Sequence, residues 1–149
     1  SSCTGQCKSC NIPGSQGSCV NIPSGQTDDN ATVTCNAGNV CNGAGVCKVA
    51  NGQACPGDPS TCLNGVCADG VCCQSTCTGT CMACNLPTKE GQCLNLPLDA
   101  TDNAPVCGGA GDANHICDGS GACLLVDGQA CLINANCAHH NCSALFCAP

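Results

Sequence analysis

Twenty-three cysteines are the feature of this 149-residue chain that most constrains its fold. They form one pattern used twice, because each cysteine of a first set is followed 72 to 76 residues later by a matching one. The first set is Cys3, Cys7, Cys10, Cys19, Cys35, Cys41, Cys47, Cys55, Cys62, Cys67 and Cys72, and the second is Cys77, Cys81, Cys84, Cys93, Cys107, Cys117, Cys123, Cys131, Cys137, Cys142 and Cys147. A fixed period predicts an array of structural units. We expect two tandem repeats, residues 1–72 with 11 cysteines and residues 73–149 with 12, the extra one being Cys73.

Bulky apolar side chains are too few to hold such units together. Val, Ile, Leu, Met and Phe number 24, and there is no Trp or Tyr. Units of this size bury too little apolar area to offset about 1–2 kcal/mol of backbone entropy per residue. Disulfides, worth roughly 2–4 kcal/mol each, supply the difference. The sequence therefore predicts a small disulfide-rich fold, with about eleven disulfides, from an oxidising compartment: secreted, extracellular or at the cell surface.

Secondary structure should be sparse, with short β-hairpins, mostly irregular loops and little or no helix. No helical or alternating pattern extends beyond five or six residues. Turn dipeptides that favour tight hairpins precede short segments ending in cysteine, at Asn42-Gly43, Asn64-Gly65, Asp69-Gly70 and Asp118-Gly119.

The charge balance bears on the partners. The formal net charge is −7, with three Lys and no Arg. Phosphate binding needs clustered Lys or Arg, so nucleic acid is not expected, and the same lack disfavours anionic lipid. Apolar runs are only a few residues long, so we predict no membrane insertion. No grouping of Ser, His and Asp supports a catalytic triad, and we predict that the chain is not an enzyme.

The cysteine spacing argues against three reactive roles and favours a structural one. Thiolate metal storage uses frequent Cys-x-Cys pairs, which this chain lacks. Cys3-x₃-Cys7-x₂-Cys10 and Cys77-x₃-Cys81-x₂-Cys84 match an iron–sulfur spacing, but no barrel-sized domain accompanies them. Cys-x-x-Cys redox pairs normally open a helix of an α/β domain, which this pattern does not predict. We therefore predict structural disulfides and no resident cofactor apart from a candidate calcium ion.

Calcium is the most credible ligand. Corresponding loops before Cys35 and Cys107 offer oxygen donors, which suit Ca²⁺; the candidates are Asp28, Asp29, Asn30, Asp102 and Asn103. Asp and Asn are also ordinary turn formers, so a purely structural role stays open.

Histidines and glycosylation sequons are confined to a few loops. His115, His139 and His140 lie in the second unit, where they are surface residues or ligands of a transition metal. Candidate glycan attachment sites are Asn30-Ala31-Thr32, Asn141-Cys142-Ser143 and the Thr/Ser-rich stretch Thr76–Thr80.

One stretch supports a resemblance to a known class of proteins. Residues 70–84, with Gly-Val-Cys-Cys-x₃-Cys-x₃-Cys-x₂-Cys, resemble the tandem Cys-rich repeats of long secreted and surface proteins of Gram-negative soil and sediment bacteria. That resemblance covers the whole chain and implies an extracellular, repeat-built, non-enzymatic body. Residues 55–73 are also loosely similar to the Cys-rich segment of Dickkopf proteins, a spacing that many small secreted modules share.

The number of cysteines is odd, and two bulky apolar residues lie near the C-terminus. If a unit begins at Cys73, the first unit is one cysteine short, and we expect its partner just upstream of the present N-terminus or on a neighbouring molecule. Leu145 and Phe146 form an apolar end that either fills a small core or docks head-to-tail onto the next copy. We predict a structural subunit of an extracellular fibre, stalk or surface assembly. The alternative is a secreted or cell-surface binding or adhesion module, or an inhibitor, that presents loops from a rigid scaffold.

Overall fold

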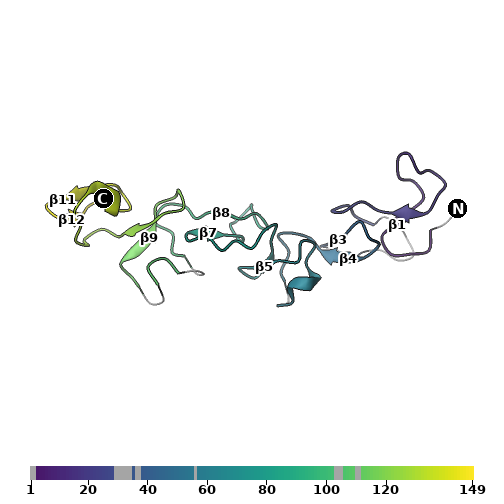
Figure 1. The fold of residues 1–149 in the computed structure, drawn as a ribbon, viewed down its shortest axis with the longest axis horizontal. Coiled ribbons are helices and arrows are strands. Elements are labelled where there is room, and N and C mark those ends of the chain that lie inside the picture. Colours follow the sequence, from purple (N-terminus) through teal and green to yellow (C-terminus); the bar gives the residue numbers. More distant parts are fainter. Residues whose placement is uncertain (1–2, 29–34, 36–37, 56, 103–105, 110–111) are drawn as a thin grey trace. The chain divides into compact units, whose positions relative to one another are not determined.

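The computed structural model describes residues 3–28, 35, 38–55, 57–102, 106–109 and 112–149. The chain divides into two compact units, Ser1–Ser75 and Thr76–Pro149. The division falls three residues after the boundary predicted from the double cysteine. Each unit is a succession of short hairpins joined by irregular loops (Figure 1).

The first unit contains three two-stranded antiparallel hairpins among its described residues. Strand β1 (Lys8–Ser9) pairs with β2 (Val20–Asn21), β3 (Asn39–Cys41) with β4 (Cys47–Val49), and β5 (Cys67–Ala68) with β6 (Val71–Cys72). A single 3₁₀ turn, η1 (Pro59–Thr61), lies between β4 and β5.

The second unit has the same order of elements. Strand β7 (Met82–Ala83) pairs with β8 (Leu94–Asn95), β9 (His115–Cys117) with β10 (Cys123–Leu125), and β11 (Cys142–Ser143) with β12 (Phe146–Cys147), and η2 (Asn134–Asn136) lies between β10 and β11. The described residues include no α-helix. The expectation of a small disulfide-rich fold with short hairpins and little helix is confirmed.

A side chain inside the turn closes each unit's middle hairpin. Asn42 Oδ1 accepts hydrogen bonds from the backbone N–H groups of Ala44 (2.8 Å) and Val46 (3.1 Å). Asp118 does the same for Ser120 (2.8 Å) and Ala122 (2.9 Å). Short polar side chains of this type bond to nearby backbone groups and so favour turns over helices.

Gly119 follows Asp118 and has φ +83°, a left-handed conformation that side chains other than hydrogen disfavour. A Cβ placed on it would lie 3.1 Å from the backbone nitrogen of Leu98. The turn therefore requires glycine for its conformation and for the close approach of the neighbouring loop.

The disulfides join corresponding positions in the two units. The described pairs are Cys7–Cys41, Cys35–Cys47, Cys55–Cys67 and Cys62–Cys72 in the first unit, and Cys77–Cys93, Cys81–Cys117, Cys107–Cys123, Cys131–Cys142 and Cys137–Cys147 in the second. The sulfur atoms of Cys3, Cys10 and Cys19 lie within 4.8 Å of one another, and Cys73 and Cys84 are disulfide-bonded. The two Cys-x-x-Cys motifs are therefore not closed on themselves, because Cys7 bonds Cys41 and Cys81 bonds Cys117.

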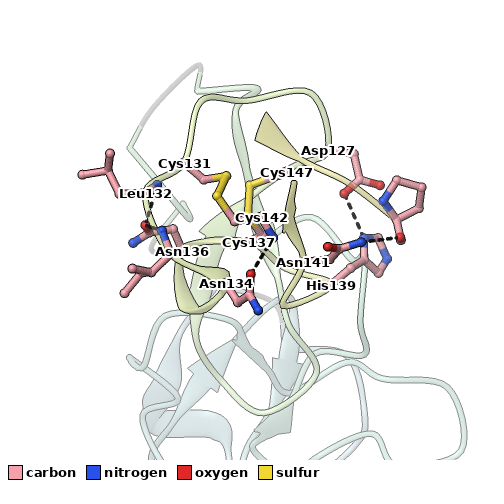
Figure 2. The surroundings of a disulfide bond; sticks show 12 residues. Asp127, Cys131, Leu132, Asn134, Asn136, Cys137, His139, Asn141, Cys142 and Cys147 are labelled. Carbon is pink, nitrogen blue, oxygen red and sulfur yellow. Dashed lines mark hydrogen bonds and ion pairs between the residues drawn. A yellow bond between two sulfur atoms is a disulfide. The ribbon is translucent and has the colours of Figure 1, made fainter. Parts of the chain in front are cut away.

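Sulfur takes the place of a conventional hydrophobic core. In the first unit Ile22 is buried against Cys7 and Cys41, and in the second unit Leu96 and Ala83 are buried with Cys81, Cys107 and Cys117. A third cluster consists of Cys131, Cys137 and Cys147 (Figure 2). Each cluster combines a few apolar contacts with covalent cross-links, which explains how so few bulky side chains suffice.

Candidate functional site

Four large apolar side chains project into solvent near the end of the second unit. Leu132 is 85% exposed, Ile133 59%, Leu145 66% and Phe146 53%. We call these four residues the C-terminal apolar surface. Their segments are adjacent, because the Cys131 N–H donates a hydrogen bond to the Leu145 carbonyl (2.9 Å) and Ala130 forms a β-bridge with Phe146.

Disulfides and side-chain hydrogen bonds fix the backbone beneath this surface. Asn136 Oδ1 accepts hydrogen bonds from the N–H groups of Leu132 (3.3 Å) and Ile133 (3.2 Å), and Asn134 Oδ1 accepts one from Cys142 (2.9 Å). In Figure 2 Leu132 points away from the Cys131–Cys142 disulfide, on the side opposite to Asp127 and His139. The apolar side chains are therefore held outward by a cross-linked loop.

From the sequence, Leu145 and Phe146 were predicted to form an apolar end that fills a small core or contacts the next copy. The structure places both in solvent at the β11–β12 turn and adds Leu132 and Ile133 beside them. The sequence-based prediction did not include Leu132 and Ile133. Two adjacent aliphatic residues between turn-forming segments could have indicated them. Exposed apolar residues that gather in one area are typical of interaction sites.

A histidine held between two carboxylates is the second feature of this unit. His139 Nδ1 lies 3.1 Å from Asp127 Oδ1, and His139 Nε2 lies 3.3 Å from Asp99 Oδ2. The hydrogen bond to Asp127, together with the negative charges of both aspartates, raises the pKa of His139. The cluster faces a small surface pocket lined by Asp99, Ile116, Val126, Asp127, Ala138 and His139.

The other histidine contact is local. His115 Nδ1 lies 2.7 Å from Asp112 Oδ2. The pKa of Asp112 is lowered mainly by a hydrogen bond from the Asn114 backbone N–H and, to a smaller extent, by the contact with His115. His140 is exposed, and neither of the two ion pairs of His139 involves it. His139 and its two carboxylates, Asp99 and Asp127, can share a proton. Binding of a transition metal by the histidines stays a prediction.

Among the described residues, each candidate calcium loop contains one buried carboxylate. Asp28 and Asp102 are both 6% exposed. Asp28 Oδ2 accepts a hydrogen bond from the Cys7 N–H (2.7 Å), and Asp102 Oδ2 accepts one from the Cys81 N–H. Cys7 and Cys81 have φ +53° and +56°, so each carboxylate bonds to a residue in the left-handed region. Asp29, Asn30 and Asn103 lie outside the described residues, and calcium binding stays a prediction for these loops.

Groups of sulfur atoms close enough for a metal are found in both units. Cys81, Cys107 and Cys117 form one such group, and Cys7, Cys35 and Cys41 with Asp28 form another. The cysteines of both groups take part in disulfides. Since metals bind the thiolate form of cysteine, these clusters are cross-linked cores in their oxidised state.

Of the candidate glycan sites, Asn141 lies at the exposed surface and donates from Nδ2 to the Pro149 carbonyl (3.1 Å). Asn30-Ala31-Thr32 lies outside the described residues. Thr76, Thr78 and Thr80 are exposed. Glycan attachment stays a prediction.

No family model, curated protein or solved structure matches the chain. Among the described residues, no helix has the length and apolar character needed to cross a bilayer. The density of disulfides is typical of proteins from oxidising compartments and gives the chain a rigid extracellular-type scaffold.

Proposed function

We propose that this chain is a structural subunit of an extracellular fibre, stalk or surface assembly. The observation that carries the proposal is the C-terminal apolar surface, where Leu132, Ile133, Leu145 and Phe146 are all more than half exposed on a cross-linked loop. The chain has only 24 bulky apolar side chains, and four of them contribute little to the stability of the fold while they are exposed to water. Burial against a neighbour gives them a stabilising role.

The occupant that we assign to this surface is a second copy of the chain. Contact between the C-terminal apolar surface and a different face of the next copy is heterologous, and such contacts extend into filaments when they do not close into a ring. The charge of −7 opposes close approach of copies, and salt screens that repulsion. The proposal therefore includes stronger association at higher ionic strength, and it assigns the chain no catalytic activity.

The test is the state of association of the purified chain, with and without a charge in the apolar surface. We expect sedimentation velocity and electron microscopy to reveal concentration-dependent filaments for the unmodified chain, and Phe146→Asp to abolish them while the disulfides remain intact. Val46→Asp is the matched control, because Val46 is 46% exposed on the other unit and receives the same charge. Dispersed monomers of the unmodified chain at all concentrations and salt levels would overturn the proposal.

The alternative is a binding or adhesion module that uses the same rigid scaffold. The pocket beside Asp99, Asp127 and His139 favours it, because the pocket places a titratable group next to apolar Ile116 and Val126. Interaction hot spots are enriched in Trp, Tyr and Arg, all of which this chain lacks. Monomeric behaviour together with retention of a ligand by His139 would favour this alternative.

A further inference from the structure

The surface pocket of the second unit combines apolar and charged side chains. Its volume is about 320 Å³, which lies at the lower end of the range for small-ligand sites. The apolar lining residues are Ile116, Val126 and Ala138, and the charged ones are Asp99, Asp127 and His139. The pocket therefore suits a small ligand that has both an apolar part and a charge.

The charged residues place one imidazole between two carboxylates. His139 Nδ1 lies 3.1 Å from Asp127 Oδ1, and His139 Nε2 lies 3.3 Å from Asp99 Oδ2; Figure 2 shows Asp127 beside His139. When His139 is neutral, one ring nitrogen has no proton, so the carboxylate beside that nitrogen loses its hydrogen-bond donor. A ligand that supplies positive charge and N–H donors can take the place of that proton.

Backbone hydrogen bonds fix the segments that carry these side chains. The N–H of Asp99 donates to the Cys117 carbonyl (3.0 Å), and the N–H of Ala138, the residue before His139, donates to the Leu125 carbonyl (3.0 Å). Cys117 ends β9 and Leu125 ends β10, so one hairpin positions both segments. A pocket that is held in this way needs little ordering when a ligand binds.

The first unit has the same backbone framework without the charges. The residues that correspond to the three charged ones in sequence order are Gly25, Asn51 and Asn64. Gly25 donates to the Cys41 carbonyl (2.8 Å), as Asp99 does to Cys117, and Asp99 keeps the left-handed conformation of Gly25, with φ +65° against +81°. The framework thus forms without these charges, and three residues that meet in space all differ from the first unit by gaining one.

We propose that the pocket beside Asp99, Asp127 and His139 binds an alkylammonium ion, a protonated primary amine on a short unbranched chain. The ammonium group donates hydrogen bonds to the carboxylates, and the alkyl chain contacts Ile116 and Val126. A metal ion fits less well, because the two carboxylates lie at different ring nitrogens and an ion bonded to one nitrogen meets only one of them. Structural and catalytic zinc sites use three or four protein ligands.

The ligand competes with a proton on His139. The charged groups that face this residue within the described part of the chain are Asp99, between β8 and β9, and Asp127, directly after β10. The hydrogen bond to Asp127, together with both negative charges, raises the pKa of His139. The imidazolium satisfies both carboxylates below that pKa, so we expect affinity for the ligand to fall about tenfold per pH unit there and to be constant above it.

Titration of the isotopically labelled chain with n-butylammonium chloride, at constant ionic strength, tests the site. We expect NMR signals of the Ile116 and Val126 methyl groups and of the His139 ring to shift saturably at pH 8.5, with a Kd of about 1 mM. Binding should be at least about tenfold weaker at pH 5.5, where His139 is protonated. n-Butanol, with the same chain and no charge, should bind at least about tenfold more weakly at pH 8.5.

Three results of this titration overturn the proposal. They are the absence of a saturable shift with n-butylammonium at pH 8.5, equal affinity for n-butanol, and saturation of the same signals by Zn²⁺ alone. None of the pocket residues belongs to the C-terminal apolar surface. Filament formation without ligand binding therefore contradicts this site alone, and ligand binding by a chain that stays monomeric contradicts the fibre alone.

The first unit supplies matched variants, because its own residues occur in the same backbone framework. Asp99→Gly and Asp127→Asn should each weaken n-butylammonium binding at pH 8.5 by about tenfold or more. Glu90→Gln removes an equal charge from an exposed position and should keep the affinity within about twofold. His139→Asn retains both carboxylates and should remove the difference between pH 5.5 and pH 8.5. Equal affinities for Asp99→Gly, Asp127→Asn and Glu90→Gln overturn the site, and a pH dependence that persists in His139→Asn overturns the competition with the proton.

Discussion

The carboxylate of Asp28 accepts a hydrogen bond from the backbone N–H of Cys7, 21 residues earlier, at 2.7 Å. Asp102 and Cys81 form the same contact in the second unit, also 21 residues apart. Each contact links the long loop after the first hairpin to the buried cysteine whose disulfide reaches that unit's middle hairpin. A hydrogen bond to a charged group of this kind stabilises a fold by about 1.5–3 kcal/mol.

Removal of these carboxylates should therefore weaken each unit. We expect Asp28→Ala and Asp102→Ala each to lower the free energy of unfolding by about 1–3 kcal/mol, because the N–H of Cys7 or Cys81 loses its buried acceptor. Thermal or denaturant unfolding measures the change. Glu90→Gln removes an equal charge from an exposed position and should leave stability nearly unchanged. Equal stabilities for Asp102→Ala and Glu90→Gln would show that this hydrogen bond contributes nothing.

Calcium binding at the same loops has a direct test. If Asp28 and Asp102 also serve as calcium ligands, EDTA should lower the Tm of the unmodified chain, and added calcium should restore it. The Asp28→Asn/Asp102→Asn variant should then show no shift with EDTA, because each amide replaces a charged ligand. An unchanged Tm of the unmodified chain in EDTA removes the calcium hypothesis, and the carboxylates keep their hydrogen-bonding role alone.

Local features of this fold could be predicted from the sequence. Asn42 and Asp118 form their turns through hydrogen bonds that span two to four residues, so the residue type and its neighbours determine the structure. The scarcity of bulky apolar residues likewise predicted a fold stabilised by disulfides, and Ile22 is buried against two disulfide-bonded cysteines, Cys7 and Cys41.

Long-range features could not be predicted. Cys7 bonds Cys41 at a separation of 34 residues, and nothing in the spacing distinguishes that partner from the other cysteines. The carboxylates around His139 come from positions 12 and 40 residues earlier in the chain, so their meeting depends on how the hairpins pack. Asp28 suggested a cation by its residue type, whereas its backbone partner became visible only in the folded unit.

Disulfides that close long loops should contribute more stability than those that close short ones. Cys81–Cys117 spans 36 residues and Cys131–Cys142 spans 11, which corresponds to about 4 and about 3 kcal/mol of loop-closure entropy. Replacing the first pair by alanine also removes two fully buried sulfur atoms from the cluster around Leu96. We therefore expect Cys81→Ala/Cys117→Ala to lower the Tm more than Cys131→Ala/Cys142→Ala. The reverse order in calorimetry would contradict the role of Cys81 and Cys117 as the centre of that unit.

The contacts of His139 should make stability depend on pH near neutrality. Because hydrogen bonding to Asp127 raises the pKa of folded His139 above its ordinary value near 6.5, the contribution is fully present below pH 6.5 and is lost as the pH rises through the raised pKa. His139→Asn is the sharpest variant, since Asn64 occupies the corresponding position of the first unit. The Tm difference between the unmodified chain and His139→Asn should be largest near pH 5.5 and should shrink toward pH 8.5. His140→Asn, at an exposed neighbour that lacks these carboxylate contacts, is the control. A Tm difference for His139→Asn that is the same at both pH values would show that protonation of His139 does not stabilise the unit.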